Sequence, residues 1–190
     1  MQKSDIGPGG DGVEYYLYHY FERKMGPFVS MSGLSIEDQM KIQSQFTSSF
    51  FIENRTQRYY ERRAELERLM RSLFIEKGGK PVLDVPYYMV LGESPFLTTW
   101  YEESEYIKIP IHEFDLQTIS FTYGDTFPTF SERITDGLEY RKKVYLYDEI
   151  SGLIQKHGLP QDSWDGTYES PCYVEAQVWS DIPVCNYRRA

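Results

Sequence analysis

Polar side chains lie inside or beside predicted strands at four places, and each place could present them to a ligand. Tyrosine has an apolar face and a hydrogen-bonding tip, and the chain holds 17 tyrosines within an aromatic content of 16%. This excess suits the binding of a flat, polar organic molecule, although tyrosines in a mixed core would produce it as well. In chain order the four places are Tyr18-His19, Tyr87-Tyr88 with Ser94 beyond, Tyr123-Gly124-Asp125, and Glu175-Ala176-Gln177.

A structural explanation competes at each place. A strand histidine such as His19 is commonly a hydrogen-bonded, half-buried residue, and the third place could be a plain strand followed by a turn. Tyr87 and Tyr88 point to opposite faces of their strand, so one of them at most lines a given cleft. The period of two puts Glu175 and Gln177 on one face and the apolar residues between them on the other. That polar face could be open to solvent.

Familiar catalytic signatures are absent from the sequence. It contains no GxxxxGK[ST], GxGxxG, GxSxG or HExxH motif. His19, His112 and His157 are scattered without metal-ligand spacing, so no metal site is predicted. Cys172 and Cys185 are expected to be ordinary reduced cysteines, with a disulfide or a metal site as the alternatives.

Length and composition limit the class of protein. A chain of 190 residues suits one domain, and contents of 41% hydrophobic and 26% charged residues exclude wholesale disorder. The formal net charge of −9 counts against coating nucleic acid by charge. No stretch approaches the roughly 20 apolar residues of a membrane span, and the start lacks the apolar core of a signal peptide. We therefore expect a cytoplasmic protein with no membrane partner.

The elements that must position these residues form an α+β pattern. Residues 1–13 are rich in glycine and predict a flexible lead-in, and residues 14–190 predict a single domain. Helices are concentrated in the N-terminal half, and a largely antiparallel sheet follows. Predicted strands cover 13–21, 85–91, 106–111, 118–122 and 173–179. Predicted helices cover 36–50, capped by Ser35, then 57–76, and a later segment that Asp148 caps and Gly158 ends.

The helix over 57–76 has the strongest signal. It lacks Gly and Pro, and Leu66, Leu69 and Leu73 recur at spacings of three and four. Its other face carries a run of mixed charges, which is most simply a solvated face with opposite charges three or four residues apart. That run comprises Arg58, Arg62, Arg63, Glu65, Glu67, Arg68 and Arg71.

Read in order, the four places resemble the core blocks of the DNA-targeting ADP-ribosyltransferase toxins of bacterial toxin–antitoxin systems. Those proteins combine a Tyr-His strand, paired arginines before a Gly-rich turn, V-P-[FY]-Y followed by S-P, F-T-x-G, and a closing strand with Glu. The blocks in this chain are Tyr18-His19, Tyr60-Glu-Arg-Arg63, Gly78-Gly79, Val85-Pro-Tyr-Tyr88, Ser94-Pro95, Phe121-Thr-Tyr-Gly124 and Glu175-Ala-Gln-Val178.

The opening strand departs from that pattern. The family continues with Thr-His and then Asn-Leu, whereas Tyr20-Phe-Glu-Arg-Lys24 follows here. The chain is also similar to an uncharacterised bacterial subfamily sharing Leu17-Tyr-His-Tyr-Phe21 and Phe121-Thr-Tyr-Gly-Asp125.

The resemblance implies an ADP-ribosyltransferase-like fold with a mixed, largely antiparallel split sheet, and transfer of ADP-ribose from NAD. Breaking the bond between nicotinamide and ribose leaves an oxocarbenium-like sugar that needs a nearby negative charge. Glu175 would be the catalytic carboxylate, and Arg63 or Arg62 would hold the NAD phosphates or position the acceptor. NAD would be bound by Tyr18, His19, Tyr87, Tyr88 and Ser94, and the acceptor by Gln177, Tyr123 and Asp125.

The acceptor implied by the resemblance is single-stranded DNA, with RNA or protein as alternatives, and an antitoxin would be a partner. Two other functions compete with this one. The first is a non-catalytic nucleotide-binding or protein-binding module with the same cleft. The second is a hydrolase or phosphotransferase of related fold, since RNA 2′-phosphotransferases share the scaffold.

Overall fold

A computed structural model describes residues 15–44 and 55–188 of the chain. Its centre is a five-stranded sheet in the order β3-β1-β2-β5-β4, and every pair of neighbours is antiparallel. The α+β class with an antiparallel sheet is therefore confirmed. The strands are β1 (Tyr16–Glu22), β2 (Tyr87–Leu91), β3 (Ser104–Pro110), β4 (Ile119–Tyr123) and β5 (Val174–Val178).

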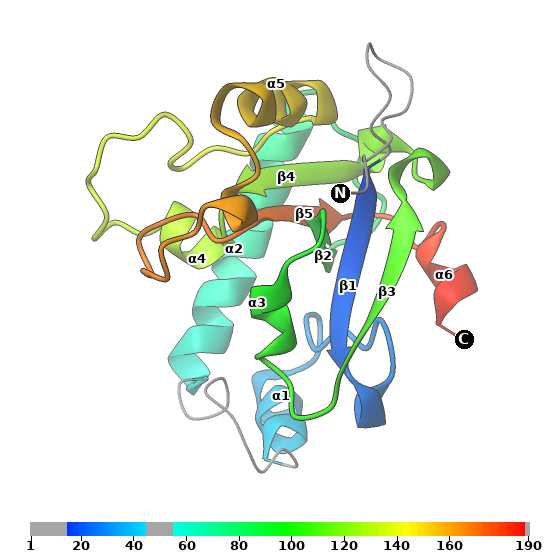
Figure 1. Cartoon of the computed structure of the whole chain (residues 1–190). Helices are drawn as coiled ribbons and strands as arrows, with labels where there is room; N and C mark the ends of the chain where they lie inside the picture. The colour runs from blue at the N-terminus through cyan, green and yellow to red at the C-terminus, as the bar shows by residue number, and fades with distance from the viewer. Residues whose placement is uncertain (1–14, 45–54, 189–190) are drawn as a thin grey trace.

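The sheet narrows at the contact between β1 and β2. β1 pairs with β3 along its whole length, from Tyr16 to Glu22, but with β2 only at Leu17 and Tyr18. β2, β5 and β4 pair over five residues each. In Figure 1, β4 and β5 run crosswise to β1 and β3, so the sheet turns sharply at this narrow junction.

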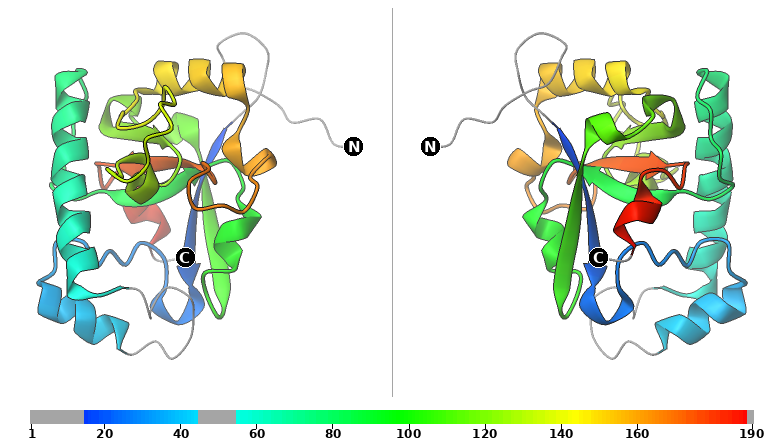
Figure 2. Two further views of the ribbon diagram at one scale, coloured as in Figure 1. Left: turned by 90° about the vertical axis from the view of Figure 1, so that its left-hand side faces the viewer. Right: turned by 90° about the vertical axis from the view of Figure 1, so that its right-hand side faces the viewer.

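Six α-helices surround the sheet in the described part of the chain. The long helix α2 stands beside the sheet, with α1 against its N-terminal end and α5 along β4 (Figure 2). The helices are α1 (Ile36–Gln43), α2 (Gln57–Glu76), α3 (Pro95–Thr98), α4 (Thr126–Thr129), α5 (Tyr147–His157) and α6 (Val184–Tyr187). Short 3₁₀ turns occur at Arg23–Met25, Ile111–Glu113, Leu116–Thr118 and Pro160–Asp162. None of these described helices is long and apolar enough to cross a membrane.

Helix ends test the sequence rules directly. α2 has the predicted limits, and the Ser35 hydroxyl caps α1 by accepting the N–H of Asp38 at 3.1 Å. α1 ends at Gln43, so the predicted helix is wrong at residue 44. Its remaining part, 45–50, lies outside the described residues. The predicted cap by Asp148 is also wrong. Glu149 instead accepts the backbone N–H of Leu146 at 2.8 Å.

Other predictions fall partly outside the described residues. The lead-in of residues 1–13 lies there, as does the predicted beginning of the first strand at 13 and 14.

Leu69, which its spacing places in the apolar row of α2, is 42% exposed. The row that packs is spaced by four residues, and Leu69 lies about 100° around the helix from its neighbour in that row. That row consists of Leu66, Met70 and Phe74.

Apolar side chains cover both faces of the sheet. On one face, α5 packs over a large core that draws on every strand. On the other face, α2 packs with residues from the loops after α4 and β5. The large core includes Leu17, Met89, Ile109, Phe121, Ala176, Ile150 and Leu153, and the smaller one Leu66, Met70, Phe74, Phe130, Val144 and Trp179. Polar groups on the α2 face are therefore enclosed between the sheet and the helix.

Candidate active site

A cavity of about 530 Å³ opens on the α2 face of the sheet. Its volume lies in the range of small-molecule sites. Four charged side chains line it in the described part of the chain: Arg55, Arg63, Asp125 and Glu175. Aromatic rings make up most of the remaining wall. They are Tyr18, Tyr20, Tyr59, Tyr88, Phe96, Trp100, Tyr101, Phe127, Trp164, Tyr168 and Tyr173.

Glu175 lies at the floor of this cavity, on β5, an interior strand of the sheet. It is 7% exposed and lies between Val90 of β2 and Thr122 of β4. Its Oε1 atom accepts hydrogen bonds from the Thr126 hydroxyl and, at 3.0 Å, from the Gln177 amide. The described residues make no hydrogen bond to Oε2, which leaves that oxygen for a ligand.

The acidity of Glu175 reflects this environment. Burial and then the charge of the neighbouring Asp125 raise its pKa, whereas hydrogen bonds from Thr126 and Gln177 and the charge of Arg63 lower it. Together they bring the pKa to about 7. A carboxylate with a pKa near neutrality can carry charge in one step of a reaction and take up a proton in another.

A chain of buried hydrogen bonds holds Glu175 from behind. The Trp179 indole bonds to the Ser120 hydroxyl at 2.8 Å, Ser120 bonds to Gln177 at 2.8 Å, and Gln177 bonds to Glu175. The Gln177 amide also bonds to Thr122 at 3.2 Å. The reading of this strand face as open to solvent is wrong because α2 and α4 cover it.

Arg63 faces Glu175 across the cavity, from α2. Its Nη1 donates to the Tyr59 hydroxyl at 3.1 Å, and its guanidinium carbon lies 4.2 Å from the centre of the Tyr88 ring. Arg62 points away. Its side chain is 42% exposed and pairs with Glu65 at 3.1 Å. The structure thus brings Arg63 to the cavity and leaves Arg62 at the surface, as the 100° step between helix neighbours requires.

Glu67 departs most from the sequence analysis. It belongs to the charge run read as a solvated face, yet it is only 3% exposed. Its Oε1 accepts hydrogen bonds from Ser32 at 2.6 Å, from Arg63 Nε at 3.2 Å and from the Tyr88 hydroxyl at 3.1 Å. A run of mixed charges contains no signal that sets this member apart, because its burial depends on what packs against α2.

A second cavity, of about 250 Å³, adjoins the first. The two share Tyr59, Arg63, Tyr88 and Trp100 among their walls. The segment that follows β1, at 25–32, makes the largest contribution to the remaining wall. Arg63 and Tyr88 therefore stand between two adjoining spaces.

His19 and Tyr87 lie on the sheet face opposite Glu175 and border the second cavity. His19 Nδ1 bonds to the Tyr88 carbonyl at 3.1 Å, and its Nε2 accepts the N–H of Phe28 at 2.9 Å. Burial lowers the His19 pKa to about 4, so the ring is neutral near pH 7. Both ring nitrogens are thus engaged with backbone. The Tyr87 hydroxyl donates to Asp181 at 3.0 Å.

Three further predicted residues do not line the first cavity. Ser94 is fully buried and donates its backbone N–H to the Tyr20 hydroxyl at 2.8 Å. Tyr123 is on the opposite face, where its hydroxyl donates to the Gly158 carbonyl at 2.9 Å. Gln177 is fully buried beneath Glu175, so in this structure it positions that carboxylate.

Tyr18 and Asp125 do line the cavity. Asp125 caps α4 by accepting the N–H of Phe127 at 2.8 Å, and it accepts the Tyr173 hydroxyl at 2.7 Å. This cap places the next residue, Thr126, against Glu175. Thr126 was missed by the sequence analysis, although the Asp-Thr-Phe-Pro sequence does carry a helix-start signal.

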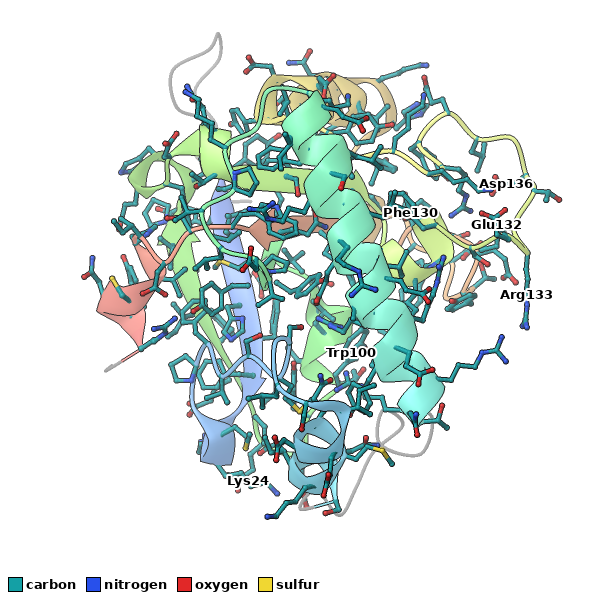
Figure 3. The ribbon with its side chains drawn as sticks, turned by 180° about the vertical axis from the view of Figure 1, so that it is seen from behind. Lys24, Trp100, Phe130, Glu132, Arg133 and Asp136 are labelled. Carbon is teal, nitrogen blue, oxygen red and sulfur yellow. The ribbon has the colours of Figure 1, made fainter. Side chains whose placement is uncertain are left out.

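The aromatic wall was also missed in part. Trp100 lies beside α2 in the view from behind, whereas Glu132, Arg133 and Asp136 lie at the edge of the molecule on the loop after α4 (Figure 3).

Cys172 lines the cavity too, but burial raises the pKa of its thiol to about 12, which makes it a poor nucleophile. Cys172 and Cys185 are both free thiols. Within the described residues, no cluster of His, Cys, Asp and Glu could hold a metal ion.

No family model, curated protein sequence or solved structure matches this chain.

Proposed function

We propose that this protein is an NAD-dependent ADP-ribosyltransferase, of the glycosyltransferase class, with Glu175 as its catalytic carboxylate. The observation that carries the proposal is Glu175 itself: a buried, hydrogen-bonded carboxylate at the floor of an aromatic cavity that also holds Arg63. The narrow junction between β1 and β2 supports the corresponding fold, because it divides the sheet into two parts. The sequence blocks that resemble this family support it independently.

The reaction would proceed by breaking the bond between ribose C1′ and the nicotinamide nitrogen. The bonding electrons leave with the ring, which departs as neutral nicotinamide, and the sugar becomes positively charged. Ionised Glu175 would stabilise that charge and hold the ribose hydroxyls. The acceptor atom then bonds to C1′, and its proton passes to Glu175, whose pKa near 7 suits both roles.

Arg63 and the tyrosines would hold the dinucleotide. A guanidinium presents its donors as a planar fork that suits phosphate oxygens, and Arg63 lies where the two cavities meet. A dinucleotide with two flat rings could thus place one ring in each cavity and its phosphates between them. Tyr18 and Tyr88 would supply aromatic surface on the side of Glu175.

The acceptor is proposed to be a base of single-stranded DNA. Trp100, Phe127 and Trp164 line the cavity that holds Glu175, and stacking of a base on such rings contributes about 1–3 kcal/mol. Arg55 and Arg63 supply positive charge to a cavity that also holds Asp125 and Glu175, within a chain of net charge −9. RNA and protein are the other acceptors to test.

The test is release of nicotinamide from NAD by the purified protein, followed by mass spectrometry of the acceptor. Oligodeoxynucleotide, RNA and lysate protein should be compared, and we expect a mass increase of one ADP-ribose on the DNA. Glu175→Gln should abolish release, whereas the peripheral Glu132→Gln should not. NAD binding without release by the wild-type protein would identify a non-catalytic nucleotide-binding module, and absence of NAD binding would refute the proposal.

A further inference from the structure

Glu67 is a buried carboxylate that takes three hydrogen bonds on one oxygen, from three different parts of the fold. Ser32 donates from the loop before α1, Arg63 from one turn earlier on α2, and Tyr88 from β2. Its side chain is 4% exposed, against 27% for the Arg63 side chain. Burying a carboxylate costs free energy unless hydrogen bonds and an opposite charge compensate for the loss of hydration, and Glu67 has both.

We infer that Glu67 is a positioning residue: it fixes the guanidinium of Arg63 and the ring of Tyr88 at the boundary of the two cavities, and thereby controls the charge that Glu175 meets. This inference rests on the proposed function, since the substrate it concerns is NAD.

The geometry around Arg63 supports the positioning role. Glu67 accepts a hydrogen bond from Nε, the Tyr59 hydroxyl accepts one from Nη1, and the Tyr88 ring lies 4.2 Å from the guanidinium carbon. None of the hydrogen bonds among the described residues uses Nη2. With three sides held, the guanidinium has one orientation, and its remaining N–H groups are available to a phosphate.

The charges around Arg63 support the second part of the inference. Arg63 bonds to Glu67 and interacts electrostatically with both Glu67 and Glu175. Because Glu67 is hydrogen-bonded to Arg63, it offsets part of the positive charge that would otherwise favour ionisation of Glu175. Asp125, Thr126 and Gln177 also face Glu175, and Tyr88, Cys172 and Tyr173 interact with it electrostatically. Tyr59 and Tyr88 face Arg63. Removing the charge of Glu67 should therefore make Glu175 ionise at lower pH.

The experiment compares Glu67→Gln with Glu65→Gln, an exposed glutamate on the same helix that pairs with Arg62. For Glu67→Gln we expect KM for NAD to rise about tenfold, as expected for loss of one charge-assisted hydrogen bond. We also expect the acid limb of nicotinamide release to move down by about one pH unit. Glu67→Asp keeps the charge but shortens the reach to Arg63, so it should raise KM and leave the pH midpoint near that of the wild type.

A second readout needs no substrate. The gap in melting temperature between a protein with Glu175 and its Glu175→Gln variant reports how far the folded-state pKa of Glu175 lies above its unfolded value. In the Glu67→Gln background this gap should therefore be smaller at pH 8 and should level off at a lower pH. If the wild type releases no nicotinamide, the proposed function fails while this readout still tests Glu67. An unchanged KM, together with an unchanged acid limb and an unchanged gap in melting temperature at pH 8, would overturn the inference. If Glu67→Gln does not fold, Glu67→Asp alone decides through KM.

Discussion

Replacing Glu175 with glutamine should stabilise the protein at neutral and alkaline pH, although it should abolish activity. The two side chains have the same shape, and an amide oxygen can still accept from Thr126 and Gln177. What the substitution removes is a negative charge in a place where burial disfavours it. The free energy of unfolding should therefore rise by the amount that ionisation of Glu175 costs the folded state.

The size of this effect follows from the pKa. Burial raises the Glu175 pKa from 4.5 to about 7. Below pH 4.5 the carboxyl is protonated in both states and adds no penalty. As pH rises from 4.5 to 7 the unfolded carboxyl ionises while the buried one stays protonated, so stability falls, and the loss is complete above pH 7. A shift of this size corresponds to about 3 kcal/mol above pH 7, and to less than about 1 kcal/mol at pH 5.

The assay is thermal unfolding of both proteins at pH 5 and pH 8. For a chain of this length, 3 kcal/mol corresponds to roughly 6–12 °C, so the variant should melt that much higher at pH 8 and nearly level at pH 5. The measured quantity is the difference in melting temperature between the two proteins, because His19 changes the stability of both with pH in the opposite direction. Its pKa is lowered to about 4, so its contribution to stability is lost as pH falls from 6.5 toward 4.

Glu132→Gln is the matched control. Glu132 lies at the edge of the molecule (Figure 3), and its pKa is lowered by its bond to Lys142, so the substitution should not raise the melting temperature. If Glu175→Gln lowers the melting temperature at pH 8, or changes it equally at both pH values, the argument from burial is refuted.

Three further outcomes are expected. Arg63→Ala should abolish nicotinamide release and lower the free energy of unfolding in urea by about 1–3 kcal/mol, because it removes the cation that pairs with the buried Glu67. Arg62 is exposed, so Arg62→Ala should change both quantities little. Thr126→Val removes a hydrogen bond to ionised Glu175, so the acid limb of the pH–rate profile should move up, and Thr126→Ser should restore it. His19→Phe should flatten the loss of stability between pH 6.5 and 4, measured as urea midpoints at both ends.

Elements with strong local signals were predictable from the sequence. The 20-residue helix α2 has the predicted limits because it lacks Gly and Pro and is followed by Gly78-Gly79. The Ser35 cap is likewise a local feature. The cap by Asp148 failed because the residue whose side chain reaches the free N–H was its neighbour Glu149, a choice that the position of the first helical turn decides.

Burial of polar side chains was not predictable. Alternation in β5 shows which residues share a face, but not that α2 and α4 cover the polar one. For the same reason Glu67 looked like any other charge on α2. Sequence spacing could limit Arg62 and Arg63 to one cavity residue, and the structure was needed to choose between them.

The chain of hydrogen bonds behind Glu175 has a direction. An indole N–H can only donate, so Trp179 requires the Ser120 oxygen to accept, and the Ser120 proton then goes to the Gln177 carbonyl oxygen. This fixes the Gln177 amide with its NH₂ toward Glu175. Every dipole in the series points its positive end at the carboxylate, and no member can reverse without breaking the rest. A tryptophan at the far end of the strand thus sets the electrical polarity of the cavity floor before any ligand arrives.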